Sequence, residues 1–319
     1  MFVGHAAVAF ALVAGVAVRR GWTAERALAV GLLAGAFAAL PDVDIAYALV
    51  GLAAAASGDA LTLASAFWST GNLVHRAVTH SLVLAPPVAL VGALAGPARQ
   101  DTRLAAGVVA LAAGVVALAW SVSGPLGAVV TVPFVLGAMV LGVLARRYTD
   151  HAPTTVFAVG LVGLVTHPFG DLVTGEPPAM LYPLDATLVA ERLVLAADPT
   201  LHLLAAFGVE LATVWAAVAV VGAATGLRPR TVVSRRASLG AGYAATVLLI
   251  PAPTLDLSYP FVFSVLGVGL VGALPRVRLV GTADGPTVEP PDWVVAGLTG
   301  LSAITVAWLA YTVAYVVVG

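Results

Sequence analysis

The sequence predicts an all-α fold, a polytopic integral membrane bundle of about eight to ten transmembrane helices. Two observations support this prediction. First, 61% of the 319 residues are hydrophobic and only 10% are charged, whereas a soluble domain carries roughly 25% charged residues. Second, the charges are separated by apolar runs that approach the ~20 residues a helix needs to cross a bilayer. The composition therefore excludes an ordinary soluble enzyme and a disordered chain.

About ten apolar runs are candidates for membrane spans. They lie near residues 4–18, 27–50, 81–96, 104–122, 125–145, 153–174, 201–224, 237–251, 257–274 and 293–318. The first run could instead be a cleaved signal peptide, but its arginines follow the apolar stretch and do not precede it. We divide the chain into a membrane domain over 1–185, which carries the polar motifs, and additional transmembrane helices of the same bundle over 186–319.

The charged residues predict how the chain lies in the membrane. All 15 basic residues are arginine, and 13 of them cluster in five short loops. These loops carry Arg19, Arg20 and Arg26; Arg99 and Arg103; Arg146 and Arg147; Arg228, Arg230, Arg235 and Arg236; and Arg276 and Arg278. With about ten crossings all five loops fall on one face, which the positive-inside rule places in the cytoplasm, with both termini outside. The chain is thus expected to be a multi-pass protein of the inner or plasma membrane.

Two function classes receive no support from the composition. The net charge is −1, so no basic surplus exists to bind a nucleic-acid backbone. Cysteine is absent, which excludes disulfides, thiolate metal ligands and a cysteine nucleophile.

The first polar motif is Pro41-Asp42-Val43-Asp44, which interrupts an apolar run. Charged side chains inside a membrane segment are costly and indicate function. Pro41 disturbs the helix, and irregular backbone at this depth is tolerated where it is buried in protein or lines a wet cavity. The alternative is a helix end with two solvated aspartates.

The second motif is the run from His75 to Ser81, which reads His-Arg-Ala-Val-Thr-His-Ser. Imidazole nitrogens suit a metal ion, and the guanidinium of Arg76 suits a phosphate oxygen. The spacing of His75 and His80 does not place both on one helical face, so at least one must lie on a turn. Thr79 or Ser81 could cap the helix that follows. The alternative is a pair of interfacial histidines without a ligand.

The third motif contains His167 and Asp171, four residues apart. On a continuous helix this spacing places both side chains on one face. Pro168 fits if a first helical turn begins there. The alternative is a structural His–Asp pair between helices. His5, at the start of the first apolar run, falls on the same predicted face as the three motifs.

Together the motifs predict a metal site. The candidate ligands are His5, Asp42, Asp44, His75, His80, His167 and Asp171. They exceed what one four-coordinate ion needs, and close metal pairs suit phosphoester hydrolysis. Zinc is the first expectation, with manganese or iron as alternatives. The candidate catalytic groups are Asp44 and Asp171, which could orient water, and Arg76, which could steady developing phosphate charge.

Other polar residues are weaker candidates. Asp198 is expected to be an N-cap, with Pro199 at the first helical position, so that His202 is not expected to be a ligand. Glu210, two turns deeper, is an intramembrane carboxylate that could act as a base, a ligand or a proton carrier. His151 is expected at the surface of the cytoplasmic face.

The order of these motifs resembles the YdjM/DUF457 family, whose members are classed as membrane-bound metal-dependent hydrolases. The matching pieces are His5, Pro41 to Asp44, His75 to Ser81, His167 to Thr174, and Leu181-Tyr182-Pro183. The resemblance covers roughly residues 1–185. The family is in turn distantly similar to zinc-dependent phospholipase C and P1-type nucleases, which implies phosphoester hydrolysis at His and Asp ligands. This sequence departs from the pattern at Pro168 and at Glu176-Pro177-Pro178.

We therefore expect a metal-dependent hydrolase at the extracytoplasmic face, acting on a small-molecule or lipid phosphoester. A lipid substrate would enter from the surrounding membrane. The alternative is an ion or proton transporter that uses the same buried residues. A third possibility is a non-catalytic scaffold that a metal ion stabilises.

Overall fold

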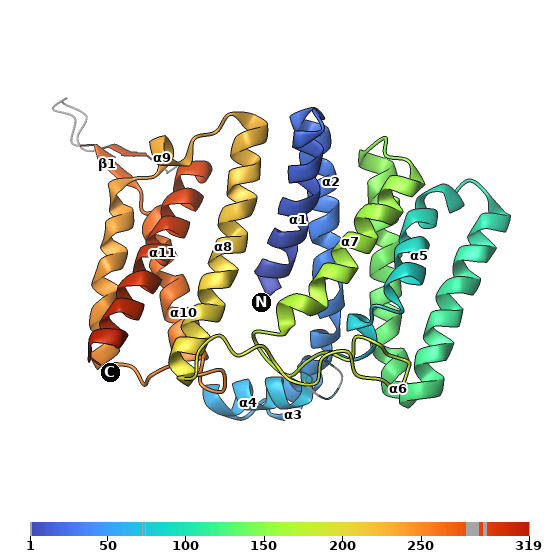
Figure 1. The fold of residues 1–319 in the computed structure, drawn as a ribbon, viewed down its shortest axis with the longest axis horizontal. Coiled ribbons are helices and arrows are strands. Elements are labelled where there is room, and N and C mark those ends of the chain that lie inside the picture. Colours follow the sequence, from blue (N-terminus) through green and yellow to red (C-terminus); the bar gives the residue numbers. More distant parts are fainter. Residues whose placement is uncertain (1, 72, 74, 279–286, 290–291, 319) are drawn as a thin grey trace. The chain divides into compact units, whose positions relative to one another are not determined.

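The computed structural model describes residues 2–71, 73, 75–278, 287–289 and 292–318. They form two compact units by their internal contacts. The first comprises Met1–Leu193 and Thr213–Thr225, and the second comprises Val194–Ala212 and Gly226–Gly319. Figure 1 shows the helices that make up each unit. The predicted division at residue 185 separates the part of the chain that carries the polar motifs from the part that does not. It stays a prediction.

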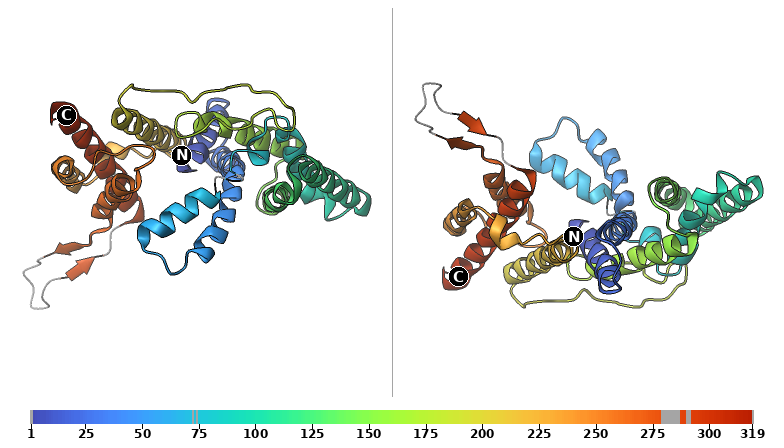
Figure 2. Two further views of the ribbon diagram at one scale, coloured as in Figure 1. Left: turned by 90° about the horizontal axis from the view of Figure 1, so that it is seen from below. Right: turned by 90° about the horizontal axis from the view of Figure 1, so that it is seen from above.

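The first unit is built from helices. They are α1 (Phe2–Arg19), α2 (Ala24–Ala39), η1 (Pro41–Tyr47), α3 (Ala48–Ala54), α4 (Ala60–Gly71), η2 (Val78–His80), α5 (Ala85–Ala98), α6 (Thr102–Tyr148) and α7 (Pro153–Asp171). The helix α8 (Pro199–Thr225) begins in the second unit, and its last turns belong to the first. Two views along the helices show α3 and α4 as a hairpin beside the other helices (Figure 2).

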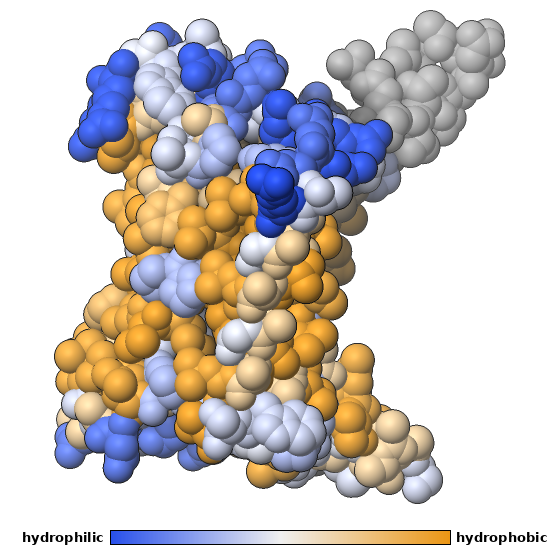
Figure 3. Space-filling model, turned by 90° about the vertical axis from the view of Figure 1, so that its right-hand side faces the viewer, coloured by the Kyte–Doolittle hydropathy of each residue, from blue (hydrophilic) through white to orange (hydrophobic). Residues whose placement is uncertain are grey.

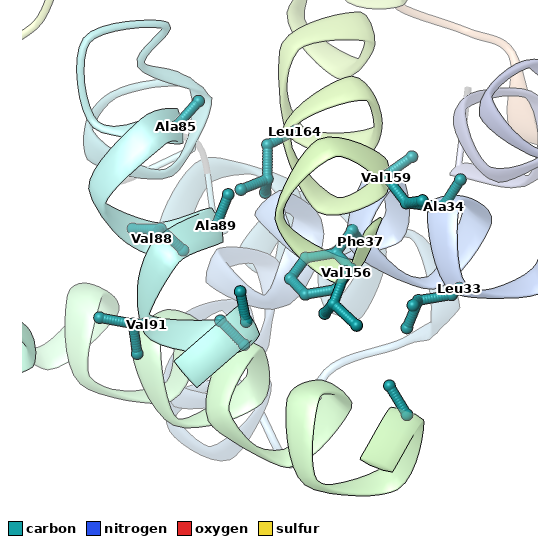
Figure 4. Packing of buried hydrophobic residues seen from close by; sticks show 14 of the residues in the cluster. Leu33, Ala34, Phe37, Ala85, Val88, Ala89, Val91, Val156, Val159 and Leu164 are labelled. Carbon is teal, nitrogen blue, oxygen red and sulfur yellow. The ribbon is translucent and has the colours of Figure 1, made fainter. Parts of the chain in front are cut away.

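The core of the first unit lies between α2, α5 and α7 (Figure 4). Phe37 of α2 is fully buried there, among small residues such as Ala34 and Ala89. In a membrane, lipid tails are as apolar as side chains, so helices associate mainly through close packing. Alanine and glycine permit this packing because they let backbones approach closely. The core therefore holds α7, which carries His167 and Asp171, firmly against α2.

The helix α2 breaks where the sequence predicts. It ends at Ala39, and Pro41 begins the 3-10 helix η1. The axes before and after this break differ by 41°. Pro41 has no N–H to continue the hydrogen bonding of α2, so the carbonyls of its last turn are left for other partners.

The helix α6 consists of two arms that meet at Gly124. Gly124 has φ 64° and ψ −158°, a conformation that is essentially restricted to glycine. A Cβ atom on Gly127 would lie 2.5 Å from the carbonyl oxygen of Ala119, although a straight helix separates such residues by about 12 Å. The two arms match the apolar runs expected at 104–122 and 125–145.

The second unit contains further helices and a small sheet. The elements are α9 (Pro229–Val232), η3 (Arg235–Leu248), α10 (Tyr259–Val268), η4 (Gly269–Ala273), β1 (Arg276–Arg278), β2 (Thr287–Glu289) and α11 (Trp293–Val318). Tyr311 and Phe261 are fully buried in its core. The indole N–H of Trp308 donates to the carbonyl of Leu204 at 2.8 Å, which ties α11 to α8.

The all-α class is confirmed. The described residues add one antiparallel strand pair, in which Val277 faces Val288. Four helices among the described residues are long and apolar enough to cross a membrane, or five if the bent segment of α2, η1 and α3 counts as one span. Three more apolar helices are shorter, at 10–17 residues. The predicted apolar runs, about ten in number, therefore coincide with helical segments. Several of these segments are shorter than the ~20 residues that a full membrane span needs.

Arginine loops that are distant in sequence meet within each unit. In the first unit, one cavity is lined by Gly96, Arg99, Gln100, Val143, Arg146 and Arg147. In the second unit, the guanidinium of Arg236 donates to the carbonyl of Leu274 at 2.7 Å, next to β1. In the side view of Figure 3, a broad hydrophobic band separates hydrophilic residues at the two ends. The common face predicted for all five arginine loops stays a prediction.

Candidate metal centre

The structure brings all seven predicted ligands together within the first unit. They come from α1 (His5), η1 (Asp42 and Asp44), the turn after α4 (His75), η2 (His80) and the last turn of α7 (His167 and Asp171). Their side chains are almost fully buried. Buried ionisable groups are unfavourable unless they pair or bind a metal ion, so this cluster needs a specific explanation.

His167 is oriented by the break in α2. Its Nδ1 lies 2.6 Å from the backbone oxygen of Ala38, one of the carbonyls that the break leaves without a helical partner. A carbonyl oxygen only accepts, so Nδ1 of His167 carries the hydrogen and donates it. Its Nε2 therefore has a free lone pair, as a metal-ligating imidazole requires.

His80 and Asp171 face this nitrogen. The Nε2 atoms of His80 and His167 are 3.0 Å apart. Oδ2 of Asp171 lies 3.1 Å from Nε2 of His80 and 3.6 Å from Nε2 of His167. Burial lowers the pKa of His80, because a protonated imidazole would lose its hydration there. Three potential ligand atoms thus converge on one place.

His5 completes one side of the cluster. Its Nε2 lies 3.2 Å from Oδ1 of Asp171, and its ring centroid lies 3.9 Å from that of His167. A Cβ atom on Gly170 would come within 2.5 Å of the ring of His5. Glycine at this position of α7 therefore makes room for His5.

Asp42 also lies beside His167. Its Oδ1 is 3.5 Å from Nε2 of His167. Oδ2 of Asp42 and Oδ2 of Asp171 are buried and have no hydrogen-bond donor within the described part of the chain. Two unsatisfied carboxylate oxygens in one buried cluster are costly, and a cation would satisfy both.

Three overlapping groups of residues could hold a metal ion. In each group the ligand atoms lie within 4.8 Å of one another. The groups are His5, Asp42 and His167; Asp42, His75 and His80; and His80, His167 and Asp171. Buried His and Asp side chains of this cluster could therefore hold a metal ion.

Asp44 has a different environment from the other six residues. Its Oδ1 lies 2.8 Å from Nδ1 of His75, and its Oδ2 accepts a hydrogen bond from Thr79 at 2.6 Å. Asp44 is in none of the three groups found among the described residues. Its predicted roles as ligand and as orienter of water stay predictions.

Arg76 reaches the cluster from a strained backbone. Its φ is 68°, in the left-handed region that non-glycine residues rarely adopt. Its Nε lies 3.7 Å from Oδ2 of Asp171, and its side chain is 19% exposed. A Cβ atom on Gly175 would collide with the guanidinium, so Gly175 provides the space that Arg76 fills.

The segment after α7 packs against the second motif. Ala179 donates its backbone N–H to the carbonyl of Arg76 at 2.8 Å, and Leu82 donates to the carbonyl of Met180 at 2.8 Å. The hydroxyl of Ser81 donates to the carbonyl of Tyr182. These bonds hold the stretch from Ala179 to Tyr182 against the second motif, beside the cluster.

Three local predictions concern the histidines of the second motif and the start of α8. The spacing predicted that at least one of His75 and His80 lies on a turn; His75 does, and His80 lies in the 3-10 helix η2. Asp198 accepts from the backbone N–H of Leu201 at 2.8 Å, which confirms its capping of α8. His202 is in none of the three groups.

Two local predictions are wrong. Pro168 does not begin a first helical turn, because α7 runs through it to Asp171. His151 is not at the surface, since it is only 8% exposed and its ring stacks on Trp22 with centroids 6.2 Å apart. Burial, followed by the charge of Arg26, lowers the pKa of His151.

Sequence reasoning missed two groups that orient the histidines. The sequence indicates Thr79 only as a candidate helix cap, yet its hydroxyl lies 2.8 Å from Nδ1 of His80. The backbone carbonyl of Ala38 cannot be recognised from the type of its side chain. It is free to accept from His167 only because α2 breaks at Pro41. Of these two groups, only Thr79 could have been found from the sequence, because it lies next to His80.

The fold and the cluster define a helical membrane protein with a buried His and Asp centre that could hold a metal ion. The chain belongs to the YdjM inner membrane protein family, whose family model matches residues 1–250. It is therefore an inner membrane protein. The match extends beyond the roughly 185 residues over which the motifs resemble the family. No curated protein and no solved structure matches the chain. The similarity to phospholipase C and P1-type nucleases stays a prediction.

Proposed function

We propose that this chain is a metal-dependent hydrolase of phosphoesters, with its centre at the extracytoplasmic face of the membrane. The observation that carries the proposal is a pair of buried carboxylate oxygens, Oδ2 of Asp42 and Oδ2 of Asp171, that have no hydrogen-bond partner among the described residues and belong to a cluster of carboxylates and imidazoles. Their negative charge and the free lone pair of His167 together favour a divalent cation. The ligands would be His5, Asp42, His75, His80, His167 and Asp171.

The type of ligand favours zinc, with manganese or iron as alternatives. Four imidazoles with two carboxylates suit these ions, whereas magnesium and calcium prefer oxygen ligands alone. Six ligands are more than one four-coordinate ion needs. The groups His5, Asp42 and His167 and Asp42, His75 and His80 share only the carboxylate of Asp42, so these two groups could each hold an ion. When bound, such ions lower the pKa of water and polarise a phosphoryl oxygen.

The chain itself would contribute substrate binding through Arg76. A guanidinium presents paired N–H donors that match the oxygens of a phosphate. Arg76 is held beside Asp171 at 3.7 Å and is the partly exposed member of an otherwise buried cluster. It would orient the phosphate and stabilise the charge that develops on it.

A lipid phosphoester fits the surroundings of the cluster. The α3–α4 hairpin connects Asp44 to His75, and its large apolar residues Leu49 and Val50 are exposed at 60% and 55%. In a membrane protein such residues contact lipid. A phospholipid headgroup could therefore approach the cluster along this hairpin, while its acyl chains remain in the bilayer.

Turnover by purified protein tests the proposal. The protein in detergent, loaded with zinc or manganese, is assayed against a soluble aryl phosphodiester and against phospholipids in mixed micelles. We expect phosphate-ester cleavage that His80→Ala abolishes and that Arg76→Gln lowers by about 10²–10³-fold. His202→Ala, which removes a buried histidine outside the three groups, is the matched control and should retain activity. Metal-loaded protein that cleaves neither substrate class would contradict the hydrolase proposal.

Ion or proton transport is the second candidate. The observation in its favour is the continuous contact between buried titratable groups, from His75 through Asp44 and His80 to Asp171. Reconstituted liposomes separate the two functions. Zinc or proton flux that His80→Ala abolishes, together with the absence of phosphoester cleavage, would favour transport.

A further inference from the structure

Both oxygens of Asp44, which belongs to none of the three ligand groups, already contact neighbouring side chains. Oδ1 lies 2.8 Å from Nδ1 of His75, and Oδ2 accepts from the hydroxyl of Thr79 at 2.6 Å. Both Asp44 and Thr79 are buried, at 1% and 3% exposure. Asp44 therefore contacts Nδ1 of His75 directly and is linked to Nδ1 of His80 by the hydroxyl of Thr79.

The hydrogen atoms in this network can be assigned from donor and acceptor rules. The hydroxyl of Thr79 contacts both Oδ2 of Asp44 and Nδ1 of His80, the latter at 2.8 Å. A hydroxyl has one hydrogen to donate, and an ionised carboxylate has none. Thr79 therefore donates to Asp44, and Nδ1 of His80 must carry a hydrogen and donate it to Thr79.

This assignment fixes the other nitrogen of His80. A neutral imidazole carries one N–H, so Nε2 of His80 is left with a free lone pair. That atom lies 3.0 Å from Nε2 of His167, whose lone pair is also free, and 3.1 Å from Oδ2 of Asp171. Two lone pairs and a carboxylate facing one another repel unless a cation lies between them.

We propose that Thr79 is a positioning residue, which links Asp44 to Nδ1 of His80 and so keeps Nε2 of His80 unprotonated and directed at the metal ion. The inference rests on the metal site of the proposed function. The inference also assigns a role to Asp44. This carboxylate would orient His75 and His80 through their Nδ1 atoms and would not itself bind the ion. Such outer partners fix the tautomer of a ligating histidine.

Removing the hydroxyl frees His80 to adopt the other tautomer. In Thr79→Val, which preserves the shape of the side chain, Nε2 of His80 can carry the hydrogen and donate it to Asp171 or His167. That hydrogen would compete with the metal ion. We expect the zinc affinity to fall about 10–100-fold, whereas Thr79→Ser, which keeps the hydroxyl, should stay within about threefold of wild type.

The measurement is a zinc titration of the full-length protein in detergent against a chromophoric chelator. Thr131→Val is the matched control, because Thr131 is also fully buried but donates to the carbonyl of Gly127 within α6. The thermal unfolding midpoint of each metal-free variant is measured in parallel. A merely structural role for Thr79 would lower the midpoint of Thr79→Val without a specific loss of zinc affinity that Thr79→Ser restores.

Asp44→Asn provides a second variant that does not depend on Thr79→Val folding. An asparagine amide can donate to Thr79, which would turn the hydroxyl toward His80 and place the hydrogen of His80 on Nε2. Its zinc affinity should fall at least as far as that of Thr79→Val. Wild-type affinity in either folded variant would overturn the inference and leave the metal site intact. A wild-type protein that binds no metal would instead overturn the proposed function itself.

Discussion

At the residue scale, the centre depends on positions that carry no ligand. Gly170 lies one residue before Asp171, where a Cβ atom would come within 2.5 Å of Cε1 and Nδ1 of His5. Real Cβ atoms do not approach other atoms this closely, so either His5 or the last turn of α7 must move. The site thus requires a residue without a side chain at position 170, where α7 packs against the ring of His5.

Gly170→Ala should displace His5 from Asp171 while leaving both ligands in the chain. We expect zinc affinity to fall roughly 10–100-fold, as for other changes that disturb ligand orientation. Chelator competition measures the loss. Gly107→Ala, where a Cβ atom would meet nothing within 4 Å, should bind zinc like wild type. Unchanged affinity in Gly170→Ala would show that His5 is not a ligand.

The ligand types could be predicted from the sequence, because carboxylates and imidazoles inside apolar runs are costly and therefore conspicuous. Their mutual distances could not, since His5 and Asp171 are 166 residues apart in sequence and meet only through the packing of α1 against α7. The contacts of Asp44 with His75 and Thr79 could not be predicted from the sequence either. A carboxylate that orients a ligand and one that binds the ion have the same side chain.

At the element scale, breaks in helices are as informative as the helices themselves. The break at Pro41 supplies the carbonyl of Ala38 to His167. The bend at Gly124 divides α6 into two arms. Both breaks coincide with a proline in the sequence, at Pro41 and Pro125, and both were predicted as interruptions of apolar runs. The expected runs at 4–18 and 81–96 are short, and the helices that match them, α1 and α5, are likewise shorter than the ~20 residues of a full span.

Gly124→Ala should destabilise the protein by about 1–3 kcal/mol, because the conformation of Gly124 is strained for any residue with a Cβ atom. The thermal unfolding midpoint in detergent should fall accordingly. Gly114→Ala, in the first arm of the same helix, meets nothing within 4 Å and should be neutral or slightly stabilising, since alanine favours a helix over glycine. Equal midpoints for the two variants would show that α6 does not need the bend.

At the scale of the whole molecule, the arginine loops predict the direction of the chain in the membrane. In the first unit Arg99, Arg146 and Arg147 line one cavity, and the positive-inside rule assigns that end to the cytoplasm. The His and Asp centre lies where the opposite ends of α2 and α7 meet η2. The proposed function therefore requires the centre to be accessible from the extracytoplasmic side.

Labelling tests this orientation cleanly, because the chain has no cysteine of its own. Gln100→Cys and Asp185→Cys each place one thiol at an exposed position of the first unit. In right-side-out vesicles a membrane-impermeant maleimide should label the thiol at position 185 and not that at position 100. In inside-out vesicles the pattern should reverse. The opposite pattern would place the centre at the cytoplasmic face.

The central claim is that the buried His and Asp cluster binds metal, and the metal content of the purified protein tests it most directly. Elemental mass spectrometry of chelator-free preparations compares wild type with His80→Ala, Asp171→Ala and the control His202→Ala. We predict near-integer zinc or manganese per chain in wild type and in His202→Ala, and a reduced content in the two cluster variants. Wild-type protein that contains no metal, and binds none when zinc or manganese is added, would contradict the account.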